Sequence, residues 1–174
     1  MRKHNGMRPQ DVPILLKVIA KGKSSWQNKD LASELYISQS EISESLNRSL
    51  IAGLINSEKR NVHRQSLLEF IIYGLRYTFP AVPGPIVRGL PTAHSHPFLK
   101  KYFDTAVIYV WPDIKGEYRG QIVEPLFKNA VKASLQDEAF YKLLALTDVF
   151  RVGKTREIKI AKEELRKSFE YESQ

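Results

Sequence analysis

A cluster of short polar side chains between residues 38 and 48 is the part of this sequence best suited to recognise another molecule. All of its members form hydrogen bonds and none is a large apolar residue: Ser38, Gln39, Ser40, Ser43, Glu44, Asn47 and Arg48. Amides pair with adenine, hydroxyls with many groups, and a guanidinium with guanine or phosphate, which is how a helix recognises bases in the DNA major groove. The alternative is a solvated helix face.

A second cluster follows directly and is basic. Lys59, Arg60, His63 and Arg64 place four potentially cationic side chains within six residues. Such a group suits phosphates or the minor groove, whereas the plainer interpretation is a charged surface turn.

Catalytic chemistry has little support in the sequence. The chain has no cysteine, which excludes thiol catalysis and cysteine-ligated metal sites, and it has no Gly-rich phosphate loop, H-E-x-x-H or G-x-S-x-G motif. His94 and His96 have a spacing that metal ligands can have, but no Asp, Glu or Cys lies close enough in sequence to complete a site. We therefore expect no enzyme, no cofactor and no metal, with both histidines packed in a loop.

Helices must position the first cluster. Apolar residues recur every three or four positions on both sides of a break at 36–38, which predicts two amphipathic helices joined by a tight turn. Ser38 and Glu41 form an S-x-x-E capping box that starts the second helix, over 39–52, and Asp30 starts the first. A preceding helix over 12–20 ends at Gly22.

The segment after the second helix predicts a small β-hairpin and one more helix. A polar turn separates two short β-prone ends between residues 54 and 64, and we expect Trp26 to pack in the core. The next helix, over 65–78, is apolar nearly all round and is therefore predicted to be buried, with Ser66 and Glu69 as its capping box.

Residues 12–64 resemble the winged helix-turn-helix of bacterial transcriptional regulators, most closely the MarR-type pattern. The residues that match the pattern are Leu31-Ala32, Leu35, Ile37-Ser38, Ser40, Ile42-Ser43, Leu46, Leu50 and Gly53-Leu54-Ile55. The resemblance implies a homodimer that places its second helix in the major groove and its wing on the flanking backbone. The wing is shorter than is typical of the family, and Glu41 and Glu44 add negative charge near the groove.

The second half of the chain predicts a loop, a hairpin and three helices. Residues 80–98 contain five prolines together with glycines, so we expect no regular element there. A strand at 105–111 is predicted to pair with 118–123 as a hairpin, followed by helices over 126–135, over 138–150 with Asp137 as its cap, and over 155–169.

This half weakly resembles a subset of winged-helix proteins that are encoded beside nucleotidyltransferase-type toxins. The similar residues are Gly84-Pro85, Arg88-Gly89, Pro91-Thr92-Ala93-His94, Leu143-Leu144-Ala145-Leu146 and Arg151-Val152-Gly153-Lys154. That resemblance implies an antitoxin-like protein whose second half binds a partner protein.

The whole chain has the composition of a globular protein with a polyanionic partner. It has 174 residues, 43% hydrophobic content and a net charge of +8, and it contains no apolar run long enough to cross a membrane. We expect a cytoplasmic, mainly helical α+β protein. Its predicted parts are a winged helix-turn-helix domain at 8–79, a Pro/Gly-rich loop at 80–104, and a smaller hairpin-and-helix region at 105–174 for dimerisation or partner binding.

Two functions remain open at this point. One is a regulator, expected to be a repressor, that binds specific double-stranded DNA as a homodimer. The other is a protein-interaction module that keeps the winged-helix fold, because fold does not determine function.

Overall fold

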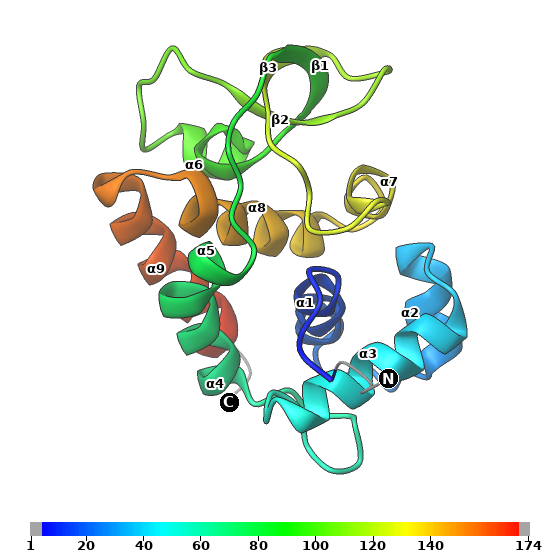
Figure 1. Ribbon diagram of the computed structural model, residues 1–174. Helices are drawn as coiled ribbons and strands as arrows, with labels where there is room; N and C mark the ends of the chain where they lie inside the picture. The colour runs from blue at the N-terminus through cyan, green and yellow to red at the C-terminus, as the bar shows by residue number, and fades with distance from the viewer. Residues whose placement is uncertain (1–4, 171–174) are drawn as a thin grey trace.

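The computed structural model describes residues 5–170, which form an α+β molecule with a small three-stranded sheet. The sheet lies at one end of the molecule and helix α3 at the other, with α1 and α8 between them (Figure 1). The helices of the N-terminal region are α1 (Asp11–Lys21), α2 (Asn28–Leu35), α3 (Gln39–Ile51), α4 (Arg64–Glu69), the π-helical turn η1 (Phe70–Gly74) and α5 (Leu75–Thr78).

Local signals set the ends of the first three helices. Gly22 ends α1 with φ +61°, and the Ser38 hydroxyl accepts a hydrogen bond from the Glu41 amide to begin α3, as predicted. Asp30 contributes to the start of α2 from inside the helix, because its carboxylate accepts from the Gln27 amide at 2.7 Å and Gln27 is the cap residue. Tyr36, at φ +57°, supplies the left-handed turn into α3.

The predicted hairpin after α3 is present at its minimum length. Ile55 and Val62 form a single antiparallel bridge, and the Asn56 side-chain oxygen accepts from the amides of Arg60 and Asn61 to close the turn. Trp26 is buried beneath it, as expected, with the Arg60 guanidinium 4.7 Å from the centre of its ring. We refer to residues 56–61 as the 56–61 turn.

The helical segment 64–78 differs from prediction at its start and in its burial. It begins at Arg64 with His63 as cap residue, so Ser66 and Glu69 do not form a capping box. Only one face is buried, through Leu67, Leu68, Ile71 and Leu75, while Tyr73 and Tyr77 are exposed.

The sheet corrects two predictions. Residues 80–98 do contain a strand, β1 (Ile86–Pro91), which pairs antiparallel with both β2 (Tyr109–Pro112) and β3 (Tyr118–Ile122). Moreover, β2 and β3 run parallel and do not form a hairpin.

Glycines explain how so short a connection joins two parallel strands. A Cβ on Gly116 would lie 2.6 Å from backbone atoms of Gly89, and a Cβ on Gly89 would lie 1.9 Å from the Trp111 carbonyl oxygen. The chain after β2 therefore crosses over β1 at a point where both segments lack side chains. Each of the three strands pairs with the other two, so the small sheet closes on itself.

The remaining helices are η2 (Ala93–Ser95), α6 (Pro97–Lys100), α7 (Ala130–Ser134), α8 (Glu138–Val152) and α9 (Thr155–Glu170). The Asp137 carboxylate caps α8 by accepting from the Phe140 amide, and Gly153 ends it, as predicted. The helix expected over 126–135 is shorter and begins only at Ala130.

Polar contacts hold the second half of the chain together and join it to α1. The buried Asp148 carboxylate accepts from Thr92 Oγ1 at 2.8 Å, Trp111 Nε1 at 2.7 Å and Arg151 Nη1 at 2.8 Å. Lys17 of α1 donates to Asp137 at 2.5 Å. One continuous cluster of buried apolar side chains extends from Val12 to Phe169.

Candidate nucleic-acid interface

Helix α3 packs on α1 and α2 and leaves one face outside. Ile42 and Leu46 anchor its inner side and are essentially fully buried. The exposed polar side chains on the outer side, which we call the α3 face, are Ser38, Gln39, Ser40, Ser43, Glu44 and Asn47. Ile51, 57% exposed, follows Asn47 on the same side at the end of the helix. The sheet of the second half lies at the other end of the molecule from this face, whereas α7 lies beside α2 and the end of α9 lies beside α4 (Figure 1).

Arg48 does not belong to the α3 face, contrary to its predicted place there. It is 6% exposed, and its guanidinium donates to both carboxylate oxygens of Asp11, at 2.9 and 2.8 Å. These hydrogen bonds raise the pKa of the guanidinium and fasten α3 to the start of α1. Arg48 therefore positions the α3 face and is withheld from any ligand.

The two carboxylates of α3 are oriented by neighbours. Glu41 accepts from the Gln10 side-chain amide at 2.7 Å, and one Glu44 oxygen lies 3.9 Å from the Arg48 guanidinium. Glu44 remains half exposed, so the α3 face keeps one negative side chain beside its hydroxyls and amides.

The four basic residues near the 56–61 turn divide into two pairs. Lys59, at φ +56°, and Arg60 lie in the turn itself. By contrast, His63 Nδ1 forms a hydrogen bond with the Gly53 carbonyl at 2.9 Å, and Arg64 donates to the Phe169 carbonyl at 3.0 Å. Arg64 thus fastens α4 to the end of α9, and Lys59 and Arg60 are the two cations of the 56–61 turn.

Contacts that sequence patterns did not indicate support the turn between α2 and α3. Asn129 donates to the Tyr36 carbonyl at 2.9 Å, and the Lys132 ammonium lies 3.8 Å from the centre of the Tyr36 ring. Both residues come from the second half, more than ninety positions away along the chain. Nothing local in the sequence pairs them with Tyr36.

Arg8 is a further basic residue near α3 that was not selected from the sequence. It is exposed, and its backbone amide donates to Asp11 at 2.8 Å, next to the Asp11–Arg48 pair. The sequence signal that could have identified Arg8 is its position just before the first helix.

The histidines of the second half do not form a metal site. His94 Nε2 donates to the Val107 carbonyl at 2.8 Å, and His96 Nδ1 accepts from the Phe98 amide. Burial lowers the pKa of His96 to about 4. Within residues 5–170, no three potential metal-ligating His, Cys, Asp or Glu side chains gather at one place.

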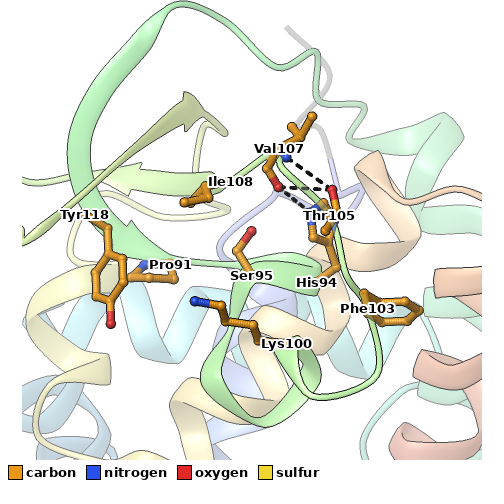
Figure 2. A pocket seen from close by; sticks show the side chains of 9 residues that line it. All are labelled: Pro91, His94, Ser95, Lys100, Phe103, Thr105, Val107, Ile108 and Tyr118. Atoms are coloured by element: carbon orange, nitrogen blue, oxygen red, sulfur yellow. Dashed lines mark hydrogen bonds between the residues drawn. The ribbon is translucent and has the colours of Figure 1, made fainter.

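The pocket beside His94 is small. Figure 2 shows Ser95, Lys100, Ile108 and Tyr118 around it, and its volume of about 20 Å³ holds about one water molecule. It offers no room for a substrate.

The α3 face can donate and accept hydrogen bonds through side chains short enough for close approach, and the 56–61 turn adds two cations.

Comparisons of the chain with family models, curated proteins and solved structures find no match. In the part of the chain that the structure describes, no helix is both long and apolar enough to span a bilayer.

Proposed function

We propose that this protein binds double-stranded DNA, with α3 in the major groove and the 56–61 turn on the neighbouring phosphate backbone. The observation that carries the proposal is the α3 face, an exposed surface of hydroxyl and amide side chains on a helix whose other side is fully packed. By its resemblance to MarR-type proteins, the protein acts as a transcriptional regulator and represses its promoter.

The chemistry of the α3 face supports base recognition. Gln39 and Asn47 present the amide group that pairs with adenine, and Ser40 and Ser43 present hydroxyls that suit several base edges. Ser38, Gln39 and Ser40 lie at the start of the helix, which is the end that contacts bases in helix-turn-helix proteins.

Charge supports the phosphate contacts. The chain carries a net charge of +8, and Lys59 and Arg60 lie next to α3 along the chain. A homodimer that contacts about six to ten phosphates loses affinity by about a thousandfold or more between low and moderate salt. A mobility-shift titration at several salt concentrations measures this slope.

Two classes of variant test the assignment on duplexes from the region upstream of the protein's own gene. Ser43→Ala or Asn47→Ala should lose about 1 to 3 kcal/mol of preference for the specific site over unrelated DNA, because each removes a base contact. Lys59→Ala or Arg60→Ala should weaken binding to all duplexes alike.

Matched controls come from exposed residues elsewhere. Gln136→Ala removes an exposed amide and Lys159→Ala an exposed cation, both outside α3 and the 56–61 turn. The proposal fails if the two classes of variant behave alike, or if they behave like the controls. Sedimentation of the free protein and of its complex tests the homodimer.

One observation favours the alternative, a module that binds a partner protein. Val82, Ile86 and Ile114 are exposed near the sheet, and Ile114 lines an open groove of about 440 Å³ together with Val87, Arg88, Pro112 and Asp113. Absence of binding to any duplex at low salt would favour this second function.

A further inference from the structure

A basic cleft lies in the second half of the chain, between α6 and the start of α9. Its volume is about 500 Å³, within the range of small-molecule sites. The residues that line it are Lys100, Lys101, Tyr102, Phe103, Asp104, Thr105 and Arg156. Figure 1 shows α6 and the first turn of α9 at the end of the molecule away from α3.

The cleft has more positive than negative charge. Three cations line it and Asp104 is its one carboxylate. Over the described range 5–170, neither Lys100 nor Arg156 forms an ion pair with an acidic residue. Their charges are therefore available to an incoming anion.

Aromatic rings hold the Lys101 ammonium, already counted in the cleft, and one further ammonium group beside it, that of Lys142. The Lys101 ammonium lies 4.3 Å from the centre of the Phe98 ring and 4.9 Å from that of Tyr102. The Lys142 ammonium lies 3.6 Å from the centre of the same Phe98 ring. Two like charges thus share one ring, an arrangement that a bound anion would relieve.

The surroundings of Lys142 disfavour its charged form. Burial lowers the pKa of its ammonium, Lys101 and Lys167 lower it further, and Glu164 opposes them. The Glu164 carboxylate is already engaged with Lys167 at 3.2 Å. Like charges are therefore concentrated here with few acids to balance them.

The small recess of Figure 2 adjoins the cleft. The two share Lys100, Phe103 and Thr105, and the recess adds Ser95 and the buried His94. His94 Nδ1 has no hydrogen-bond partner among residues 5–170, although a Glu157 carboxylate oxygen lies 3.6 Å away. The recess supplies polar groups next to the cations.

We propose that this cleft binds a small molecule carrying two or more phosphate groups, held by Lys100, Lys101 and Arg156. Two lysine ammonium groups and one guanidinium match the charge density of linked phosphates, and the guanidinium can donate two parallel hydrogen bonds to one of them. The Tyr102 ring, 38% exposed, offers a surface for the base of a nucleotide. The proposal depends on the cleft alone and not on DNA binding by α3.

Calorimetric titration of the full chain with sodium tripolyphosphate, at low salt, is the first test. The wild type should bind, and the double variant Lys100→Ala/Arg156→Ala should bind at least about tenfold more weakly, since two charge-assisted contacts are removed. Lys128→Ala/Lys159→Ala removes the same charge from exposed positions outside the cleft and should bind like the wild type. All four substitutions are at exposed residues, and thermal unfolding checks that each variant folds.

A parallel titration with ATP distinguishes the two sources of the phosphates. If Tyr102→Ala weakens ATP but not tripolyphosphate, the ligand is a nucleotide; if both bind that variant unchanged, it is a free polyphosphate. Either outcome supports the site. Equal affinities of the two double variants, or no binding of either probe by the wild type at millimolar concentration, overturn it.

Mobility shifts on the same variants separate this proposal from the DNA-binding one. If Lys100→Ala/Arg156→Ala weakens duplex binding as strongly as Arg60→Ala, the cleft belongs to a DNA surface and the small-molecule site is overturned. Failure of the wild type to bind any duplex, with tripolyphosphate binding intact, removes the proposed function and leaves this site standing.

Discussion

Within residues 5–170, each half of the molecule contains a buried arginine–aspartate pair, and the two pairs have different surroundings. Arg48 and Asp11 form a two-point contact between α3 and α1, and Asp11 also accepts from the Arg8 amide next to it. Asp148 instead accepts from Arg151, Thr92 and Trp111 at once. Arg151 in turn donates to the carbonyls of Phe79 at 3.0 Å and Glu124 at 2.9 Å.

The difference shows how each region is held. The Arg48 pair orients a single helix and leaves its outer face free for a ligand. The Asp148 network fastens four separate segments to one helix, α8: Phe79 directly after α5, Thr92 directly after β1, Trp111 in β2 and Glu124 just beyond β3. We therefore expect the second region to depend on its central carboxylate more heavily than the first region depends on Asp11.

The largest effect is expected from Asp148→Ala. The substitution leaves the buried Arg151 charge without its carboxylate and removes the acceptor for Thr92 and Trp111, which should lower the free energy of unfolding by about 3 to 5 kcal/mol. Urea unfolding followed by circular dichroism measures the loss. A loss below about 1 kcal/mol would mean that the network does not hold the second region together.

Asp11→Ala should have a smaller effect, of about 3 kcal/mol, since Arg48 retains Glu44 as a nearby carboxylate. Asp11→Ala/Arg48→Met removes both charges and should recover part of that loss, because no uncompensated charge stays buried. If the double variant also keeps duplex binding, Arg48 acts by positioning α3. A double variant that is less stable than Asp11→Ala would contradict this account.

The contrast between the regions also explains what the sequence could predict. The first three helices begin and end at local signals, such as the Ser38 hydroxyl with the Glu41 amide, so local patterns located them. The predicted Ser66 and Glu69 capping box is absent from α4, whose start was therefore not located in this way. Strand β1 pairs with partners about twenty or more positions away, and the chain approaches Gly89 closely at Gly116 and Trp111. No pattern within the 80–98 segment contains that information.

The candidate site shows the same division. Periodicity placed Ser43 and Asn47 on the outside of α3 correctly, yet residue type alone suggested that Arg48 joins them. Its partner Asp11 lies 37 positions away as the first residue of the apolar helix α1, where a buried carboxylate requires a cation. This acidic residue next to an apolar stretch is the sequence signal that could have indicated a buried basic partner for Asp11.

His96 gives the second region a pH dependence of its own. Because burial lowers its folded-state pKa from 6.5 to about 4, the unfolded chain takes up the proton first as the pH falls, and stability is lost across that window. Between pH 7 and pH 5 the loss should be about 2 kcal/mol. Protonation of His96 Nδ1 also removes the acceptor of the hydrogen bond from the Phe98 amide.

His96→Gln is the matched variant for this measurement. Its free energy of unfolding should change less than that of the wild type between pH 7 and pH 5, a range above the ordinary pKa values of carboxyl groups. Parallel curves for the two proteins would show that another group causes the dependence.

The smallest effect is expected from Ser38→Ala in the first region. The variant loses the hydroxyl that accepts from the Glu41 amide, and a lost cap costs about 1 kcal/mol of stability. Ser40→Ala is the control. Within the described chain the Ser40 hydroxyl contacts only the Ser38 hydroxyl, at 3.2 Å, so this variant should leave the free energy of unfolding nearly unchanged. Ser38→Gly should cost only a few tenths of a kcal/mol, since glycine tolerates a cap position. Equal stabilities of Ser38→Ala and Ser40→Ala would mean that packing of Ile42 and Leu46, and not the cap, sets where α3 begins.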